Sequence, residues 1–463
     1  MAVTSRSDVL YAADFRQKLA PLLGPGTPSF SRAGAARLLT AEGRYAKLRR
    51  DQYRGRWTPL NLDEAGTLAR RKGLLLEKGV TPTTDDSVDF SSGSAWGRSF
   101  FDSEESAPSI FDDLPSGGEA RKVTESGGDG SPRIEQGTAT FTGDKETAVL
   151  IVERTGPFDA GDTSRVGVLD TDTVSFPFRA EYEWDADSVS ITDGSGTAVR
   201  EVLTESGPNG GRVVLIAVTG SGTSGNNREL RGYSAWDGNS TSILHYCDHT
   251  ELAFPTSPIP YVGSPVARQG EEFFVSPGHY QTGLTTAHYV DLINRHFPGN
   301  NIFPRIICIG DGSNPFVRTF LDDTNEGQVR LRFFDKDGNK YNADCNVGTL
   351  KPGDRLEVVL LLDPSDGQVR IVARSSSGHT GSDQGTPGSW TTPTDLGADN
   401  RYVYDEKASL DNGQRSSLIF LRHHAIDATQ LDGGTFSANA DDLMNEMAGI
   451  HVGPNGGVVS LNT

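Results

Sequence analysis

The chain has 463 residues, of which 35% are hydrophobic, 54 are glycine and 24 are proline, and its net charge at pH 7 is −19. The apolar fraction is low but sufficient for packed cores, which excludes a wholly disordered chain, and the length fits two or three domains. The acidic balance disfavours nucleic acid and anionic membrane surfaces as partners. Glycine and proline clustered with Asp, Asn, Ser and Thr favour short strands joined by turns over long helices.

The charge is unevenly distributed along the chain. Residues 1–80 hold 15 basic and 7 acidic residues, which leaves 28 basic and 55 acidic residues for the remainder. A basic N-terminal segment on an acidic body predicts docking to other proteins at one end and display at the other. Contact with DNA is the less favoured alternative, because the segment has no recognisable reader helix or aromatic-interleaved basic patch.

Cysteine usage and hydropathy indicate where the protein is made. Cys247, Cys308 and Cys345 are an odd number in a long chain, which predicts reduced and mostly buried thiols. The N-terminal sequence has no apolar stretch long enough for a signal peptide, and no segment approaches the length of a membrane span. We therefore expect assembly in a host cytoplasm, with no membrane partner.

The N-terminal region is expected to hold an arm, residues 1–27, and a basic docking module, residues 28–90. Asp8 is a candidate cap for a short helix that carries Leu10, Phe15 and Leu19. The module has few strand signals and ends in the apolar run KGLLLEKG.

From about residue 91 onward the pattern changes to strands and turns. Runs such as TAVLIVER and RVVLIAVTG alternate with turns rich in Gly and Asp every 8–15 residues, the spacing of a β-sandwich. The first sandwich is predicted over residues 91–268. Its last segment, ELAFPTSPIPYVGSPVAR, is rich in proline and is interpreted as an irregular exit.

The second sandwich is predicted over residues 269–463. In QVRIVARS (368–375) the apolar residues share one face, whereas RLEVVLLLD (355–363) is apolar on both faces, which favours a central strand covered on each side. DKDGN (335–339) and DPSDGQ (363–368) are predicted hairpin turns. A short helix capped by Asn439, with Leu443 and Met447 on one face, is expected near the end. The predicted fold class is mainly β.

Four local patterns occur in an order that resembles a family of tailed-phage virion structural proteins of the head-spike or tail-fibre type. They are similar to that family's "FxRAS…G…R", "GLLIE…TN", "S…W" and "FPTSYIPT…TR" steps. Here they read SFSRAGAARLLTAEGRYAKLRRDQYR (29–54), KGLLLEKGVT (72–81), SSGSAWG (91–97) and ELAFPTSPIPYVGSPVAR (251–268).

The resemblance implies a virion component that is usually oligomeric, here most simply a homotrimer, in contact with other capsid or tail proteins. It also implies two jelly-roll sandwiches of the concanavalin or laminin-G type and binding to host surface glycans. It does not imply a shared reaction. The preferred interpretation is an accessory virion protein without enzyme activity. The alternatives are a receptor-binding lectin at a tail tip and a polysaccharide-degrading glycoside hydrolase.

The carboxylates of EYEWDAD (181–187) are candidates for chemistry. In a continuous strand Glu181, Glu183, Asp185 and Asp187 would share one face, with neighbours about 6–7 Å apart, which is near the separation that glycosidases use. Glycosidases also need one carboxyl kept protonated by an apolar pocket. Three interpretations therefore remain: a solvated face, a Ca²⁺ site at Glu183, Asp185 and Asp187, or a catalytic pair. No other cofactor is expected.

Aromatic residues are candidates for stacking on sugar rings. Tyr233 and Trp236 lie in the loop-like stretch YSAWDGN, and Trp390 lies in a polar segment of the second sandwich. The competing interpretation is that these residues belong to a core. A further pattern, HYCDH (245–249), places His245, Cys247 and His249 on one strand face. Those ligands span about 13 Å, too far for one metal ion, so a structural role is favoured.

Overall fold

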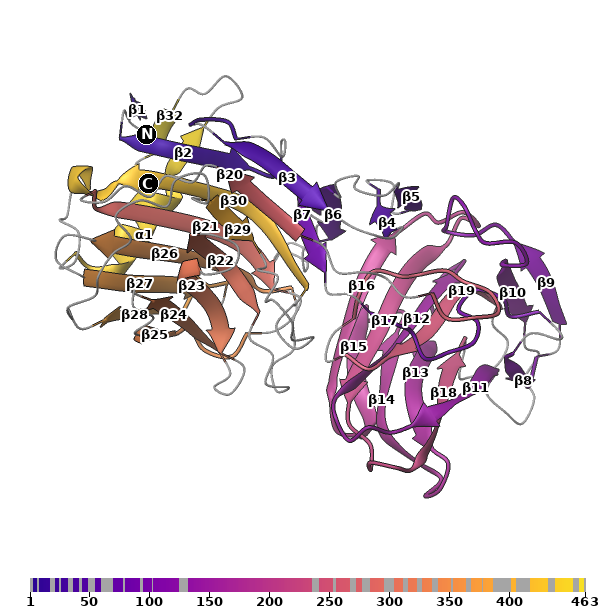
Figure 1. The fold of residues 1–463 in the computed structure, drawn as a ribbon. Helices are drawn as coiled ribbons and strands as arrows, with labels where there is room; N and C mark the ends of the chain where they lie inside the picture. Colours follow the sequence, from indigo (N-terminus) through magenta and orange to yellow (C-terminus); the bar gives the residue numbers. More distant parts are fainter. Residues whose placement is uncertain are drawn as a thin grey trace.

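Alternating burial along the strands defines the architecture of this mainly β protein. In β14 (Ser175–Glu183), Phe178, Ala180 and Tyr182 are buried, and the residues between them are partly exposed. Because side chains alternate between the faces of a strand, such a strand has one face in a core. These strands build two sandwiches that lie side by side (Figure 1). The computed structural model describes residues 3–5, 8–16, 21–24, 26–31, 36–40, 44–48, 55–59, 70–77, 80–91, 95–101, 103–124, 132–234, 241–252, 255–266, 272–276, 284–294, 304–310, 315–322, 327–334, 340–350, 353–363, 368–376, 378–385, 401–404, 417–431, 438–452 and 458–461.

The first sandwich consists of two six-stranded antiparallel sheets. Sheet A, in strand order, contains β16 (Thr197–Thr204), β17 (Arg212–Gly220), β12 (Glu146–Arg154), β19 (Thr241–Thr250), β10 (Ala120–Thr124) and β9 (Ser103–Ala107). Sheet B contains β15 (Ser188–Gly194), β14, β13 (Thr163–Asp170), β18 (Asn227–Tyr233), β11 (Arg133–Thr140) and β8 (Gly97–Ser99). The core between the sheets includes Leu150, Phe178, Trp184 and Ile216.

The second sandwich combines strands from both ends of the chain. Sheet C contains β28 (Thr380–Gly385), β27 (Gln368–Ser375), β26 (Arg355–Asp363), β21 (Thr286–Asn294), β30 (Ser417–Asp427), β7 (Arg70–Glu77) and β6 (Gly55–Pro59), and β2 (Val9–Asp14) also pairs with β30. Sheet D contains β25 (Lys340–Asn346), β24 (Gln328–Phe334), β23 (Pro315–Asp322), β22 (Arg305–Gly310), β29 (Arg401–Tyr404), β20 (Glu272–Ser276) and β3 (Thr27–Ser31). The core between these sheets includes Tyr11, Phe273, Leu360 and Phe420.

Sheets A and C are covered on their outer faces as well. On sheet A, the hairpin of β4 (Ala36–Leu39) and β5 (Tyr45–Leu48) places Leu39 and Tyr45 against Val149 and Leu215. On sheet C, α1 (Ala440–Ala448) and the short 3-10 helix η2 (Ala428–Gln430) cover a cluster that includes Val359, Leu361, Leu443, Met444 and Met447. This cover explains why β26 is buried along nearly its whole length, and the predicted central strand is confirmed.

Several other sequence predictions are confirmed. Asn439 caps α1 by accepting hydrogen bonds from the backbone N–H groups of Asp441 and Asp442. The pairs Phe334↔Lys340 and Asp363↔Gln368 join antiparallel neighbours, as the two predicted hairpins require, although the turn residues lie outside the described ones. The mainly β class with two sandwiches is confirmed. No helix in the described ranges is long and apolar enough to cross a membrane.

The prediction for the N-terminal region was wrong in two respects. Residues 9–14 form strand β2 and not a helix, because Tyr11, Ala13 and Phe15 alternate into the core of the second sandwich. The described strands β2, β3 and β7 are paired with β30 or β20, so the arm and the basic module supply strands to the second sandwich.

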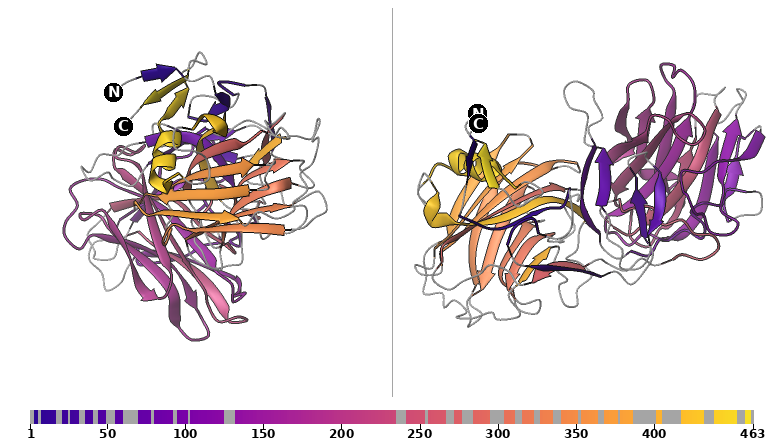
Figure 2. Two further views of the ribbon diagram at one scale, coloured as in Figure 1. Left: turned by 90° about the vertical axis from the view of Figure 1, so that its left-hand side faces the viewer. Right: turned by 90° about the horizontal axis from the view of Figure 1, so that it is seen from above.

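The two ends of the described chain meet in a small sheet of their own. β1 (Val3–Ser5) pairs with β32 (Val458–Leu461), which pairs with β31 (Ile450–Val452). Figure 2 shows both termini beside each other at one end of the second sandwich. β31 therefore lies near β2 and β30, and this placement forms a cavity treated below.

The two sandwiches share a strand plan. Sheet B contains the order β15-β14-β13-β18-β11, and sheet D contains the corresponding order β24-β23-β22-β29-β20. Opposite these, β12 pairs with β19 as β21 pairs with β30. Both pairs shift register between the sixth and seventh residues of a nine-residue strand, at Ile151/Val152 and at Asp291/Leu292. The shared strand order and the shared position of the bulge indicate that the two sandwiches have the same strand topology.

Phe15→Ala tests whether the N-terminal segment is part of the second sandwich. The Phe15 ring is fully buried, with ring centroids 5.6 Å from Phe273 and 5.3 Å from Tyr404. Removing such a ring should lower the free energy of unfolding by about 3–5 kcal/mol, measured by urea denaturation. Phe100→Ala, at a ring that is 51% exposed, is the matched control and should cost less than about 1 kcal/mol. Equal losses in both variants would contradict this packing.

Candidate functional site

The outer face of sheet B carries two rows of polar side chains that cross its strands. Strand register aligns Gly97, Glu135, Arg231, Gly167, Arg179 and Asp193 in one row. The next row aligns Ser99, Arg133, Tyr233, Arg165, Glu181 and Ser190. Their sequence neighbours, such as Ile134, Leu230 and Ala180, point into the core, so these rows lie on the opposite face. We call this surface the Arg–Tyr face.

Arginines and carboxylates form ion pairs on the Arg–Tyr face. The Arg133 Nε lies 2.7 Å from Glu135 Oε2, and the Arg231 Nε lies 2.5 Å from Glu229 Oε1. Arg165 pairs with Glu181, and Arg179 pairs with Asp193. Cross-strand pairs of opposite charge stabilise a sheet. The result is an ordered set of donors and acceptors on one face of the sheet.

Two aromatic rings lie among these charges. The Arg179 guanidinium lies 4.4 Å from the centroid of the Phe176 ring and 6.0 Å from that of Tyr233. The Arg231 guanidinium lies 5.9 Å from the Phe176 ring. Such cation–π contacts fix the planes of the guanidinium groups relative to the rings.

Gly167 occupies the middle of one row for a steric reason. A Cβ at this position would lie 2.8 Å from the Arg179 Cβ and 2.9 Å from its Cα, closer than packed atoms approach. Glycine therefore allows the Arg179 side chain to lie across strand β13. A larger residue would displace this arginine and its contact with Phe176.

Burial and pairing act in opposite directions on the arginines of this face. Burial lowers the pKa of Arg165, and Glu181 opposes the change. For Arg231, burial again acts to lower the pKa, but hydrogen bonds with Glu229 and Tyr233 outweigh it and the pKa is raised. Arg165 and Arg231 are thus both charged donors at neutral pH.

The structure locates one of the three predicted glycan residues. Tyr233 ends β18 on the Arg–Tyr face, is 3% exposed and contacts neighbouring arginines, so it is not part of the inner core. Trp236 and Trp390 lie outside the described residues. The sequence pattern did not single out Arg165, Arg179 or Phe176, because only cross-strand register brings them to Tyr233.

The four carboxylates of residues 181–187 do not form one line. β14 ends at Glu183, and residues 184–187 form a turn in which Asp187 has a φ of 47°. Glu181 is paired with Arg165, while Asp187 accepts a hydrogen bond from Tyr182 at 2.8 Å and pairs with Arg200 at 3.0 Å. No group of three His, Cys, Asp or Glu side chains able to hold a metal ion is found within the described ranges. Calcium at Glu183, Asp185 and Asp187 stays a prediction, and Asp187 would have to exchange its partners.

The residues of HYCDH are buried in structural roles. The register shift beside Ile151 turns His245 to the outer face of sheet A, where its Nε2 lies 3.0 Å from Glu153 Oε2. Cys247 lies in the core between the sheets. His249 lies 3.1 Å from Glu146, which also pairs with the fully buried Arg228 at 2.5 Å. The expectation of one shared face was therefore wrong, because a β-bulge interrupts the alternation.

Comparisons with known proteins give distant likenesses. No protein-family model and no curated protein matches the chain. The carbohydrate-binding module CBM40 of the Ruminococcus gnavus IT-sialidase, solved with alpha2,3 sialyllactose, is 12% identical over 35% of this chain and 81% of its own, with a TM-score of 0.25.

Two further solved structures cover more of the chain. The tail fibre protein gp63.1 of an E. coli phage is 12% identical over 75% of this chain and 40% of its own, with a TM-score of 0.19. The tandem CBM22 domains of Paenibacillus barcinonensis Xyn10C are 10% identical over 71% of this chain and 97% of their own, with a TM-score of 0.23. Likenesses this weak assign no function, and the mainly β architecture follows from the sheet pairing itself.

Acid should destabilise the first sandwich at pH values where ordinary carboxylates are still ionised. Burial lowers the pKa of His245 and of His249, against the opposing Glu153 and Glu146. Both rings take up protons on unfolding once the pH falls below their ordinary value of about 6.5. The free energy of unfolding should therefore decrease from about pH 7 to about pH 5.

Asp248→Asn tests the sign of this effect. Burial raises the pKa of Asp248 to about 6 in the folded state. Between pH 7 and 5 the folded state therefore takes up a proton at Asp248, which stabilises it and partly offsets the destabilisation by the two histidines. The variant lacks this gain, and its stability should fall by about 1 kcal/mol more than that of the wild type between pH 7 and 5, measured by urea denaturation. The exposed control His379→Gln should follow the wild-type curve. A shallower fall in Asp248→Asn would contradict the assignment.

Proposed function

We propose that the chain is a carbohydrate-binding adhesion subunit of a tailed-phage virion and that the Arg–Tyr face is its glycan site. The observation that carries this proposal is the set of arginine–carboxylate pairs on one sheet face around the partly exposed Phe176 ring, with the buried Tyr233 ring beside them. Sugars present hydroxyl groups that both donate and accept hydrogen bonds, together with apolar C–H faces. Guanidinium and carboxylate groups supply the partners for the hydroxyls, and aromatic rings pack against the C–H faces.

The virion part of the proposal is supported by the order of four sequence patterns over residues 29–268. Such particle components are usually oligomeric, and a homotrimer would present several copies of a weak glycan site together, which raises the overall avidity. The basic N-terminal segment is the proposed contact to other capsid or tail proteins. Its strands β2, β3, β6 and β7 belong to the second sandwich, whereas its β4–β5 hairpin covers sheet A of the first, so docking would use a surface of either sandwich.

We further propose that the protein is not an enzyme. A glycoside hydrolase needs one carboxyl group that stays protonated near neutral pH and a second that is ionised. On the Arg–Tyr face Glu135, Glu181 and Asp193 are each paired with an arginine, whereas a general acid of a hydrolase lies in an apolar pocket. The alternatives, a tail-tip receptor-binding lectin and a polysaccharide-degrading hydrolase, differ from the proposal in location and in turnover.

Arg179→Ala tests the glycan site. The purified chain should bind at least one member of a panel of capsule and lipopolysaccharide glycans in an immobilised array. Loss of Arg179 removes two donors and the stacking partner of Phe176, so binding should weaken about tenfold or more. Arg44→Ala is the matched control, because Arg44 is exposed and pairs with Asp112 beside sheet A. Melting temperatures show that both variants are folded.

Two outcomes would contradict the glycan proposal. One is equal binding by wild type and Arg179→Ala, and the other is no binding to any glycan of the panel. In the same incubations we expect no release of reducing sugar. Release that Glu183→Gln with Asp185→Asn abolishes would overturn the assignment as a non-enzyme.

Antibodies against the chain test the virion part separately. They should label purified phage particles in electron micrographs at a fixed position on the head or the tail. Absence of the chain from purified particles would contradict the virion assignment and would leave the glycan site standing.

A further inference from the structure

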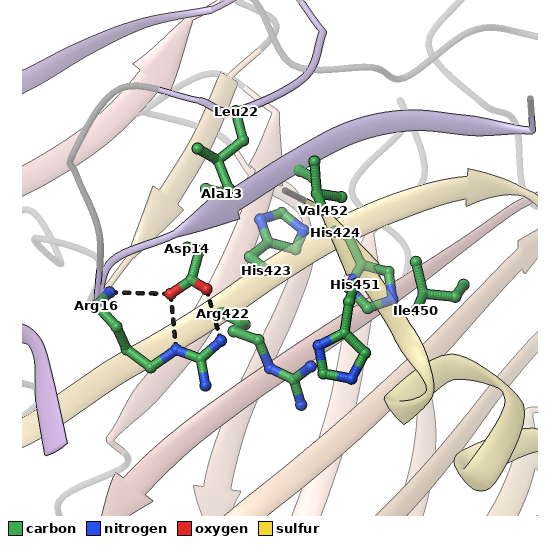
Figure 3. A pocket seen from close by; sticks show the side chains of 11 residues that line it. Ala13, Asp14, Arg16, Leu22, Arg422, His423, His424, Ile450, His451 and Val452 are labelled. Carbon is green, nitrogen blue, oxygen red and sulfur yellow. Dashed lines mark hydrogen bonds and ion pairs between the residues drawn. The ribbon is translucent and has the colours of Figure 1, made fainter. Parts of the chain in front are cut away.

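A cavity of about 90 Å³ lies in the second sandwich between β2, β30 and β31. Figure 3 shows its polar side, where Asp14, Arg16, Arg422 and His451 lie together, and its apolar side, formed with Leu22 and Val452. A water molecule needs roughly 10–15 Å³ measured in this way. The cavity therefore has room for several water-sized groups.

Arg422 is held rigidly at the cavity wall. Its Nε donates to Asp291 Oδ2 at 3.1 Å, one terminal nitrogen donates to the Tyr289 hydroxyl at 2.9 Å, and the other lies 3.4 Å from the Ala448 carbonyl at the end of α1. The side chain is 9% exposed. An arginine fixed by several partners loses little conformational entropy when it binds a further group.

The network to which Arg422 belongs contains more cations than anions among the described residues. Asp291 also accepts two hydrogen bonds from Arg355, at 2.8 and 2.9 Å, and Arg355 and Arg374 both pair with Glu357. Across the cavity Arg16 pairs with Asp14, with Nε 2.7 Å from Oδ1. Three guanidinium groups, those of Arg355, Arg374 and Arg422, thus share two carboxylates, Asp291 and Glu357, while the Arg16–Asp14 pair is balanced by itself. Of these groups Asp14, Arg16 and Arg422 line the cavity. One positive charge of this network is not balanced within it.

We propose that this cavity binds a small carboxylate, with Arg16 and Arg422 contacting the anion, His451 donating a hydrogen bond, and Leu22 and Val452 packing against its carbon body. A monoanion balances the charge of the network. A planar carboxylate matches the fork of donors that a guanidinium presents. The apolar wall favours an organic anion over an inorganic dianion. This site lies on the second sandwich and does not depend on the Arg–Tyr face.

His451 is a natural reporter for the occupant. Partial burial and the positive charges of Arg422 and Arg16 lower its pKa, and Asp14 opposes the change. A carboxylate bound beside the ring adds a negative charge, which favours the imidazolium. Occupancy should therefore raise the pKa of His451.

The test is a titration of the full chain, with labelled histidines, followed by NMR. Acetate and glucuronate should shift the His451 resonances saturably, with a Kd of about 1 mM or tighter, and should raise the pKa of this ring. Glucose, the neutral counterpart of glucuronate, should cause no shift. If only glucuronate binds, the carboxylate belongs to an acidic sugar. If only acetate binds, a hexuronic acid is excluded as the occupant. Either result supports the proposal that the cavity binds a carboxylate.

Two half-exposed positions provide variants that retain the buried network. Arg16→Gln should weaken acetate binding about tenfold, and His451→Gln should remove the shifting resonance and assign it. Arg44→Gln, in the β4–β5 hairpin, is the control and should bind as the wild type does. Melting temperatures establish that each variant is folded. No saturable shift with any carboxylate, tighter binding of phosphate than of acetate, or unchanged affinity in Arg16→Gln would each overturn the proposal.

Discussion

The second sandwich depends on the pairing of strand β30. One edge of β30 is bonded to β21 along its length, and its other edge is divided between β7, opposite residues 417–420, and β2, opposite residues 422–426. Buried backbone groups without partners cost about 1–3 kcal/mol each, so this edge has to be covered. Two segments from the N-terminal region complete it. The same pairing places Asp14 and Arg16 across from Arg422, so the cavity exists only where the first and last parts of the chain meet.

Charge is arranged differently at the two sites. On the Arg–Tyr face each arginine of the two rows already has a carboxylate partner. A neutral ligand therefore has to hydrogen-bond to groups that are already paired, and each such contact contributes little binding free energy. Under the proposed adhesion role, presentation of several copies would compensate for such weak contacts. The cavity network instead holds one cation more than it has anions, which selects a ligand by its charge. A neutral polymer suits the first arrangement, and a compact anion suits the second.

Local pattern predicted the strands of the two sandwiches better than it predicted their assembly. Alternation in residues 368–375 and the apolar run of residues 355–363 placed β27 and β26 correctly, and Asn439 marked the start of α1. β2 was missed because its partner lies some 400 residues away, and the alternation of Tyr11, Ala13 and Phe15 is too short to exclude a helix.

The site was predictable only at Tyr233, where an aromatic residue ends a strand beside a polar loop. Its neighbours Arg133 and Arg165 come from other strands, and their register depends on turns and bulges that periodicity does not fix. The bulge that separates His245 from Cys247 is a further case. A regular alternation predicts that both side chains lie on the same face of the strand. The single extra residue of the bulge places them on opposite faces.

The pairing of β2 with β30 has a consequence for how the protein is made. β2 leaves the ribosome first among these strands and β30 almost last, whereas every strand of the first sandwich lies between them in the chain. At synthesis rates of about 5–20 residues per second, the N-terminal strand waits roughly 20–80 s for its partner. The first sandwich can close during that interval. Throughout it, the nascent N-terminal segment carries Tyr11 and Phe15 without the sheet that will bury them, which exposes apolar surface of the kind that chaperones bind.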